Sequence, residues 1–292
     1  MVHDKLELDS KNFPVLAVLY PDELQFLRSI AKTIELVADV PVIMEGQQPE
    51  SLFLIQTGLL VVNKRHDKDI FEVGSLTPGE IFGEAGVLFN TPAGAEVRSI
   101  EPVTLLAIAA EQVREIINKN SRFAHALAQL AERRSAASAL AVNPIFSKLP
   151  IAVRETLLYN AQYISYTPGD VVFEEGDEDI DHMFLVLSGE ARASISHPSD
   201  EDKETMVAHI TSGDEVGEIS VISGRPRAAT VTALTPLRLL TIKMESVDAW
   251  RRRYSDFGYA LYAQVQGKMQ RALAATRPQG TEADKPSEAA GA

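Results

Sequence analysis

The chain has 292 residues, a length that fits two ordinary domains of about 100 to 150 residues each. It contains no cysteine, which excludes disulfides and thiolate zinc sites and fits a reducing cytoplasm. With 28 basic against 41 acidic residues, the formal net charge is −13, which opposes nonspecific attraction to nucleic acid or to anionic lipid.

In chain order, residues 1–11 are polar and predicted to be a disordered N-terminus. Between them and residue 275, short β-rich runs are broken by Gly, Pro and Asp, as in jelly-roll strands. Two stretches, 112–141 and 245–275, carry apolar residues at helical spacing. The Pro-, Gly- and acid-rich tail 276–292 is predicted to be disordered, which leaves no room for a DNA-reading helix-turn-helix. We therefore predict mainly β structure with flanking helices.

No signal-peptide pattern occurs, and no apolar run approaches the roughly 20 residues that span a bilayer. We predict a cytoplasmic protein without a membrane or nucleic-acid partner. The part of the first helical stretch from Phe123 to Val142 is dense in alanine, and Asn143–Pro144 ends it. Such a helix can approach a neighbour closely, as a coupler between domains or as the face of a homodimer, although high helix propensity alone also selects alanine.

The candidate binding residues are concentrated in the segment GDEVGEISVISGRPRAAT, residues 213 to 230. Gly217 permits a tight turn, and the amides after it can form an anion nest. Arg227 adds a permanent charge with forked donors, whereas Glu218 suits a sugar hydroxyl better than a phosphate. The pattern indicates a site for a small anionic ligand that carries a sugar; a glycine-rich turn with a surface ion pair is the alternative.

A second copy, GEIFGEAGVLFNTPAGAEV, runs from Gly79 to Val97 and aligns without a gap at an offset of 134. Further matches lie outside these segments, at offsets from 130 to 134, so the chain is an internal duplication. We assign one domain to residues 12–142 and the other to residues 143–275. Ala93 stands at the position of Arg227, Gly86 at that of Ser220 and Glu96 at that of Thr230. We expect Glu96 to repel a phosphate and the first site to be degenerate.

These segments resemble the phosphate-binding cassette of cyclic-nucleotide-binding domains, as in the regulatory subunit of cAMP-dependent protein kinase and in catabolite activator proteins. The resemblance covers about residues 12 to 275 and implies two tandem jelly-roll domains. It implies that Glu218 binds the ribose 2′-hydroxyl and that Arg227 binds the cyclic phosphate. The site residues that it implies are Gly217, Glu218, Ile219, Ser220, Arg227, Ala228 and Ala229.

The same resemblance implies that the C-terminal helix covers the base. Tyr262, Gln266 and Met269 are then candidate base contacts, with packing inside the helical stripe as the alternative. In relatives selective for cGMP a hydroxyl residue often follows the cassette arginine; here Ala228 does. The expected ligand is therefore cAMP rather than cGMP.

No catalytic constellation and no metal-ligand spacing among the six histidines is found. We predict a non-enzymatic regulatory protein that binds a cyclic nucleotide, requires no catalytic cofactor and acts through helix rearrangement on an unidentified protein effector. A scaffold that keeps the fold for protein contacts, without physiological nucleotide binding, is the alternative, and an enzyme subunit is a more distant one.

Overall fold

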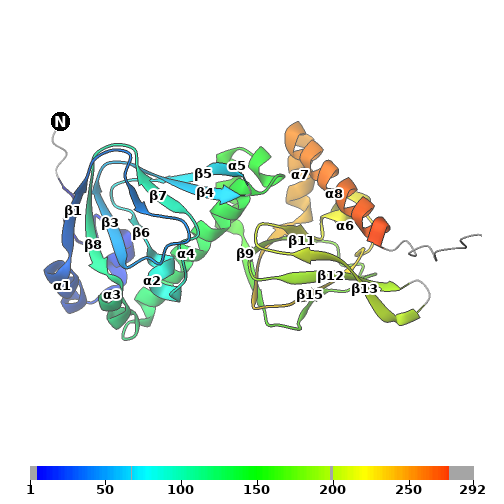
Figure 1. Ribbon diagram of the computed structural model, residues 1–292, viewed down its shortest axis with the longest axis horizontal. Coiled ribbons are helices and arrows are strands. Elements are labelled where there is room, and N and C mark those ends of the chain that lie inside the picture. Colours follow the sequence, from blue (N-terminus) through cyan, green and yellow to red (C-terminus); the bar gives the residue numbers. More distant parts are fainter. Residues whose placement is uncertain (1–4, 67, 198–199, 276–292) are drawn as a thin grey trace, which may run out of the picture. The chain divides into compact units, whose positions relative to one another are not determined.

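The computed structural model describes residues 5–66, 68–197 and 200–275. The chain divides into two compact units, unit 1 (Met1–Ala161) and unit 2 (Gln162–Ala292). Each unit contains two four-stranded antiparallel sheets with attached helices (Figure 1). The predicted fold class, mainly β with flanking helices in two tandem jelly rolls, is confirmed.

The strand order is the same in both units. In unit 1 the sheets run β1-β8-β3-β6 and β2-β7-β4-β5, and in unit 2 they run β9-β16-β11-β14 and β10-β15-β12-β13. The strands of unit 1 are β1 (Lys32–Leu36), β2 (Pro41–Ile43), β3 (Ser51–Thr57), β4 (Leu60–His66), β5 (Asp69–Leu76), β6 (Ile81–Phe82), β7 (Glu96–Ser99) and β8 (Val103–Ala109). Those of unit 2 are β9 (Gln162–Tyr166), β10 (Val171–Phe173), β11 (His182–Ser188), β12 (Ala191–His197), β13 (Asp200–Ile210), β14 (Glu215–Val216), β15 (Thr230–Ala233) and β16 (Leu237–Lys243).

Each of the two predicted helical stretches is broken once. The first consists of α3 (Ala110–Ile117) and α4 (Ser121–Val142), and the second of α7 (Met244–Arg253) and α8 (Ser255–Ala275). The break before α4 arises because Asn120 is extended and its side chain accepts a hydrogen bond from the Phe123 amide, 3.0 Å away, as an N-cap. The remaining helices are η1 (Pro14–Val18), α1 (Pro21–Ile30), α2 (Glu84–Phe89), η2 (Phe146–Lys148), α5 (Ile151–Asn160) and α6 (Glu218–Ser223).

The end of α4 at Asn143 is as predicted: this residue is extended, and its side chain accepts from the amides of Ile145 and Phe146. Four of the alanines of α4 are buried in the structure: Ala131, Ala136, Ala139 and Ala141. Helix α4 packs against α2, η1, η2 and α5, all of unit 1. These contacts account for its small side chains, and the homodimer stays a prediction.

Residues 143–161 group with unit 1, although the repeat boundary predicted from sequence gives them to the second domain. The reason is that η2 and α5 pack on α4. The domain boundary that packing defines lies after η2 and α5, whereas the boundary predicted from the sequence repeat lies before them.

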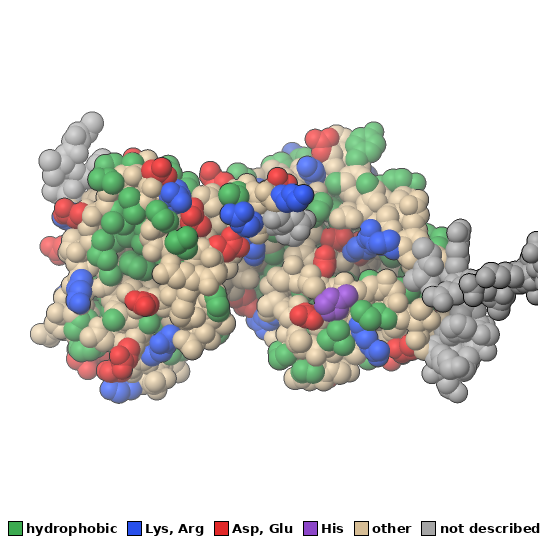
Figure 2. Space-filling view, in the orientation of Figure 1, with side chains coloured by type: hydrophobic (Ala, Val, Ile, Leu, Met, Phe, Trp, Pro, Cys, Tyr) green, Lys and Arg blue, Asp and Glu red, His purple; other side chains and the backbone are tan. Residues whose placement is uncertain are grey.

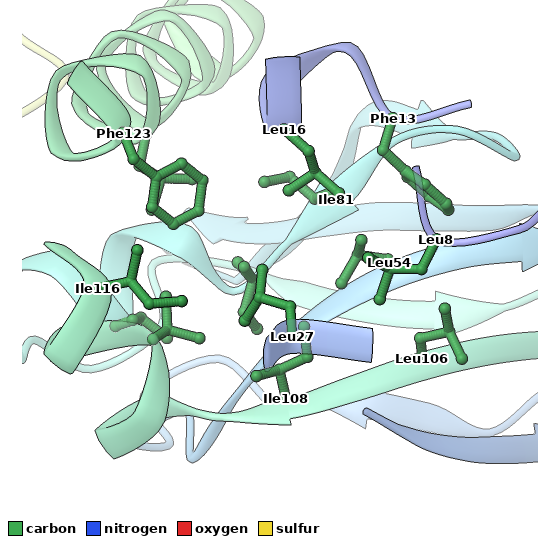
Figure 3. Close-up of a cluster of buried hydrophobic side chains, with 14 of the residues drawn as sticks. Leu8, Phe13, Leu16, Leu27, Leu54, Ile81, Leu106, Ile108, Ile116 and Phe123 are labelled. Carbon is green, nitrogen blue, oxygen red and sulfur yellow. The ribbon is translucent and has the colours of Figure 1, made fainter. Parts of the chain in front are cut away.

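The prediction of disorder for residues 1–11 is wrong for residues 5–11. Leu8 is buried in a cluster with Phe13, Leu54 and Leu106 (Figure 3). The Leu6 carbonyl accepts from Gln56 Nε2 at 2.5 Å, and the Leu8 carbonyl accepts from Arg28 Nε at 2.7 Å. Leu8 anchors the segment, because burying one leucine stabilises the fold by about 1.5 to 3 kcal/mol, and the partly buried Leu6 adds to this. Residues 1–4 and the predicted disordered tail 276–292 lie outside the described residues.

In the described parts of the chain, no helix is both long and apolar enough to cross a membrane. Those same parts contain no cluster of three or more His, Asp or Glu side chains that could hold a metal ion. On the face drawn in Figure 2, the described Lys and Arg side chains are scattered among Asp and Glu and do not form one continuous basic surface.

Candidate functional site

The cassette of unit 2 is a turn that leads from a short strand into a short helix. After β14, Gly217 has φ 84°, in the left-handed region, and α6 begins at once with Glu218. Helix α6 ends at Gly224, which is also left-handed, and the chain then returns through Pro226 to Arg227. Ser220 Oγ donates to the Pro226 carbonyl at 3.3 Å and so ties the helix to the returning segment. The turn thereby brings Glu218 and Arg227 into one small region.

Arg227 is held by its main chain, by two hydrogen bonds of its guanidinium and by one aromatic ring. Its main chain bonds with Gly176 and Asp177, its Nη2 donates to the His182 carbonyl at 2.8 Å, and its Nη1 donates to the Gly217 carbonyl at 3.3 Å. The guanidinium carbon lies 4.5 Å from the centroid of the Phe173 ring. Nε is buried and has no hydrogen-bond partner among the described residues.

The side chain of Arg227 is only 4% exposed. Burial lowers its pKa, while Asp179, Asp177 and other nearby acids oppose that shift, and an arginine remains a cation in either case. An unsatisfied buried donor on a charged group is costly. Nε is therefore the donor of Arg227 for which an added acceptor would stabilise the site most.

The second charged group of the site is Glu218, which is 2% exposed. Lys268 Nζ, from α8, lies 2.9 Å from Glu218 Oε1 and 2.8 Å from Glu215 Oε1, and it donates to the Glu215 carbonyl at 2.6 Å. Burial raises the pKa of the Glu218 carboxyl, and Lys268 opposes the shift. Burial lowers the pKa of Lys268, but the two carboxylates outweigh it and the net shift is upward. One ammonium thus joins α8 to the cassette.

A cavity of about 590 Å³ lies against this cassette, between β12, β13 and the last turns of α8. Its volume and mostly apolar wall are typical of a small-molecule site. Of the residues predicted from sequence, those that line it are Gly217, Glu218, Ile219, Ser220, Ala228, Ala229 and Met269. Arg227 is adjacent in the chain to the lining residue Ala228 but is not itself part of the wall.

Tyr262 and Gln266 are exposed and do not line the cavity. The cavity meets α8 only from Lys268 to Leu273, and Tyr262 lies about 10 Å further back along the helix axis at 1.5 Å per residue. Sequence reasoning missed Phe173, Lys268 and Arg271, which do line it. Lys268 had a usable signal, because Arg134 is its counterpart at the offset of 134.

Unit 1 preserves one half of this arrangement. Gly83 has φ 87°, Glu84 is buried, and Arg134 Nη1 of α4 lies 3.1 Å from Glu84 Oε2 and donates to the Ile81 carbonyl. These two contacts of Arg134 correspond to the contacts of Lys268 with the Glu218 carboxylate and with the Glu215 carbonyl, since each residue lies 134 positions before its counterpart. A cavity of about 430 Å³ lies beside them. The carboxylate and its cation from the helix are therefore common to both units.

The other half has changed. The Ala93 main chain bonds with Gly46 and Gln47, as Arg227 does with Gly176 and Asp177, so the two residues are structurally equivalent. Unit 1 has a methyl group where unit 2 has a guanidinium. At Gly86 a Cβ atom would lie 2.5 Å from Pro49 Cγ, which leaves no room for a serine.

The expected repulsion between Glu96 and a phosphate stays a prediction, and the structure places this carboxylate in an ion pair. The Glu96 carboxylate is paired with Arg98 Nε at 2.8 Å, and this hydrogen bond lowers the pKa of Glu96. Glu96 also does not line the cavity. Arg98 also pairs with Asp39 at 3.0 Å. The two changes from unit 2 that line the cavity are therefore Gly86 and Ala93.

Gly217→Ala should destabilise unit 2 for two reasons. A left-handed backbone costs a non-glycine residue roughly 1 to 3 kcal/mol, and the new Cβ would lie 2.6 Å from Arg227 Nη1. Gly224→Ala is the matched control, because its φ of 63° carries similar strain but no atom lies within 4 Å of the new Cβ. Urea unfolding followed by the fluorescence of Trp250, the only tryptophan of the chain, reports on unit 2. Equal losses in the two variants would contradict a contact between Gly217 and Arg227.

The chain is similar in sequence to known proteins. The chain is 27% identical over 214 residues to the cAMP-dependent protein kinase regulatory subunit of Colletotrichum orbiculare, covering 70% of this chain and 51% of the relative. It is 29% identical over 202 residues to that of Yarrowia lipolytica, covering 69% and 49%. It thus spans about half the length of these curated relatives.

Among solved structures, the regulatory domain of Toxoplasma gondii PKA with cAMP is similar at 22% identity and a TM-score of 0.38, covering 94% of this chain and 99% of that one. The sequence pattern of the family described as cyclic nucleotide-binding domain matches residues 33–120 and 163–254, together more than half of the chain. The chain therefore belongs to the cyclic nucleotide-binding domain family and contains that domain twice.

Proposed function

We propose that this protein is a non-enzymatic regulator that binds one cyclic nucleotide, cAMP in preference to cGMP, in unit 2 and acts on a protein effector. The observation that carries the proposal is the buried Arg227, whose Nε has no partner in the described part of the chain and which is adjacent to a cavity that Glu218 lines. A cyclic phosphate supplies acceptor oxygens for Nε and for the amides at Gly217, Ser220 and Ala228. A ribose hydroxyl donates to Glu218.

Binding at Glu218 also offers a route to an effector. Lys268 is bonded to Glu218 and Glu215 and belongs to α8, so a hydroxyl that reaches Glu218 changes what holds this helix. The ligand favours whichever position of α8 it binds more tightly, and the effector responds to that position. The names of the curated relatives suggest a kinase as the effector class, but the chain matches only about half of their length. We therefore leave the effector as an unidentified protein.

Calorimetric titration of the purified protein with cAMP and cGMP tests this proposal. We expect cAMP to bind more tightly, because Ala228, on the cavity wall, has no hydroxyl for the guanine amino group. Ala228→Thr should narrow the difference, whereas Ala208→Thr, which adds a hydroxyl to another wall of the cavity, should not. Equal or reversed affinities in the parent protein would refute the preference. If neither nucleotide binds, the protein is a scaffold that has kept the fold.

A further inference from the structure

The guanidinium of Arg227 rests on an aromatic ring that no cassette residue supplies. Phe173 is the last residue of β10 and pairs with Val231 of β15. Its ring centroid is 4.5 Å from the Arg227 guanidinium carbon, and it also stacks on Phe184 at 6.2 Å with an interplanar angle of 21°. A cation over a ring face is attracted by the ring quadrupole, most strongly where water is excluded. Arg227 is nearly fully buried, so this contact is of the strong kind.

Unit 1 has neither the ring nor the guanidinium of this contact. Ile43 ends β2 and pairs with Val97 of β7, the register that Phe173 has with Val231. Ile43 is 5% exposed in the core of unit 1, and Ala93 packs against the same core. The ring and the guanidinium are thus absent together, and their corner has become apolar. The aromatic residue and the arginine are therefore both present in unit 2 and both replaced in unit 1.

The ring of Phe173 affects where the guanidinium of Arg227 lies in unit 2. Two donors of Arg227 are held by backbone carbonyls, and Nε has no partner among the described residues. Asp177, Asp179 and Asp181 come shortly after β10 in the chain. Their carboxylates attract the positive charge of the Arg227 guanidinium. A long side chain without a platform would be drawn toward these carboxylates, since charge-assisted hydrogen bonds are the strong ones. The ring holds the guanidinium where Nε stays available.

We propose that Phe173 is a positioning residue that sets phosphate recognition in unit 2 by holding Arg227. The inference rests on the proposed function, since it assumes that Arg227 binds a phosphate. It differs from a direct role of Phe173 on the ligand, which its place on the cavity wall also permits. The experiment has to separate these two roles.

The test measures cAMP affinity by competition with a fluorescent cyclic nucleotide on the full chain. Phe173→Ile, which installs the residue of unit 1, should weaken cAMP binding by about 5- to 30-fold, the worth of a desolvated cation–π contact. Phe173→Tyr keeps the ring and should restore affinity to within about threefold of the parent. Phe184→Leu removes the neighbouring ring but keeps the ring of Phe173 that lies over the guanidinium, so affinity should also stay within about threefold.

A double-mutant cycle distinguishes positioning from direct contact. Arg227→Lys keeps a charge but loses the planar group that stacks on the ring. In that background Phe173→Ile should weaken cAMP binding by less than about threefold. The same 5- to 30-fold loss in both backgrounds, or no loss in either, would overturn the inference. Trp250 fluorescence verifies folding of unit 2, and Phe173→Met, whose unbranched side chain adapts to an irregular space, replaces the isoleucine variant if that one unfolds. A parent protein that does not bind cAMP refutes the proposed function instead.

Discussion

Arg227→Ala is expected to weaken cAMP binding by about 30-fold to several thousand-fold, because removing one partner of a buried charge-assisted contact costs about 2 to 5 kcal/mol. The structural reason is that Arg227 is the buried cation behind the cassette, with Nε unpartnered among the described residues. Calorimetry of parent and variant with cAMP measures the difference.

Two further variants make this result specific. Arg225→Ala removes a like charge two residues earlier, but Arg225 is exposed, so its loss should change affinity by no more than about threefold. Glu218→Gln should weaken binding less than Arg227→Ala, since an amide oxygen still accepts from a hydroxyl. Parent-like binding by a folded Arg227→Ala protein would show that the proposed pocket is wrong.

Lys268→Met is expected to destabilise unit 2 by about 3 to 5 kcal/mol at neutral pH, because it leaves a buried ionic cluster without its cation. Glu215 and Glu218 are each about 2% exposed and share the Lys268 ammonium. Urea unfolding followed by Trp250 fluorescence measures the loss. Lys243→Met, at an exposed lysine of the same unit, is the control and should stay within about 0.5 kcal/mol of the parent.

The effect of pH on this variant has a definite sign. Burial already raises the pKa of Glu218 above its ordinary value of 4.5, and loss of the ammonium raises it further. The folded variant then holds a proton that the unfolded chain has released, so its stability falls as pH rises above 4.5 toward the raised pKa. The loss of unfolding free energy relative to the parent should therefore be smaller at acid pH than at neutral pH. A deficit that does not change with pH would contradict a buried carboxylate pair.

Much of the architecture could be predicted because the chain is duplicated. Matching two segments at a fixed offset identified the tandem repeat, the glycine turns and the exchange of Arg227 for Ala93 before any packing was known. The turn chemistry is local: a left-handed glycine that starts a short helix depends on residues close in sequence, and both copies have it.

What sequence could not supply depends on contacts between distant elements. The ring of Phe173 approaches Arg227 from another strand. Lys268 is marked by Arg134 at the repeat offset, but its contact with the cassette spans about 50 residues of sequence. The same limit applies to Leu8, which is held by a core built from β3, β6 and β8. Of the three base contacts predicted on α8, Met269 lines the cavity and Tyr262 and Gln266 do not, because only packing decides that the cavity begins at Lys268.

The central claim is that only the second of the two copies binds a cyclic nucleotide. By the magnitude given above for Arg227, a site that binds at micromolar strength with arginine should weaken to about 30 micromolar or beyond where Ala93 replaces it. Calorimetric titration of the full chain with saturating cAMP measures the stoichiometry, and a crystal structure of the complex locates the ligand. The account predicts one tight site per chain, with the nucleotide against Glu218 and Arg227. Two tight sites per chain, or nucleotide bound against Glu84 in unit 1 at comparable occupancy, would contradict it.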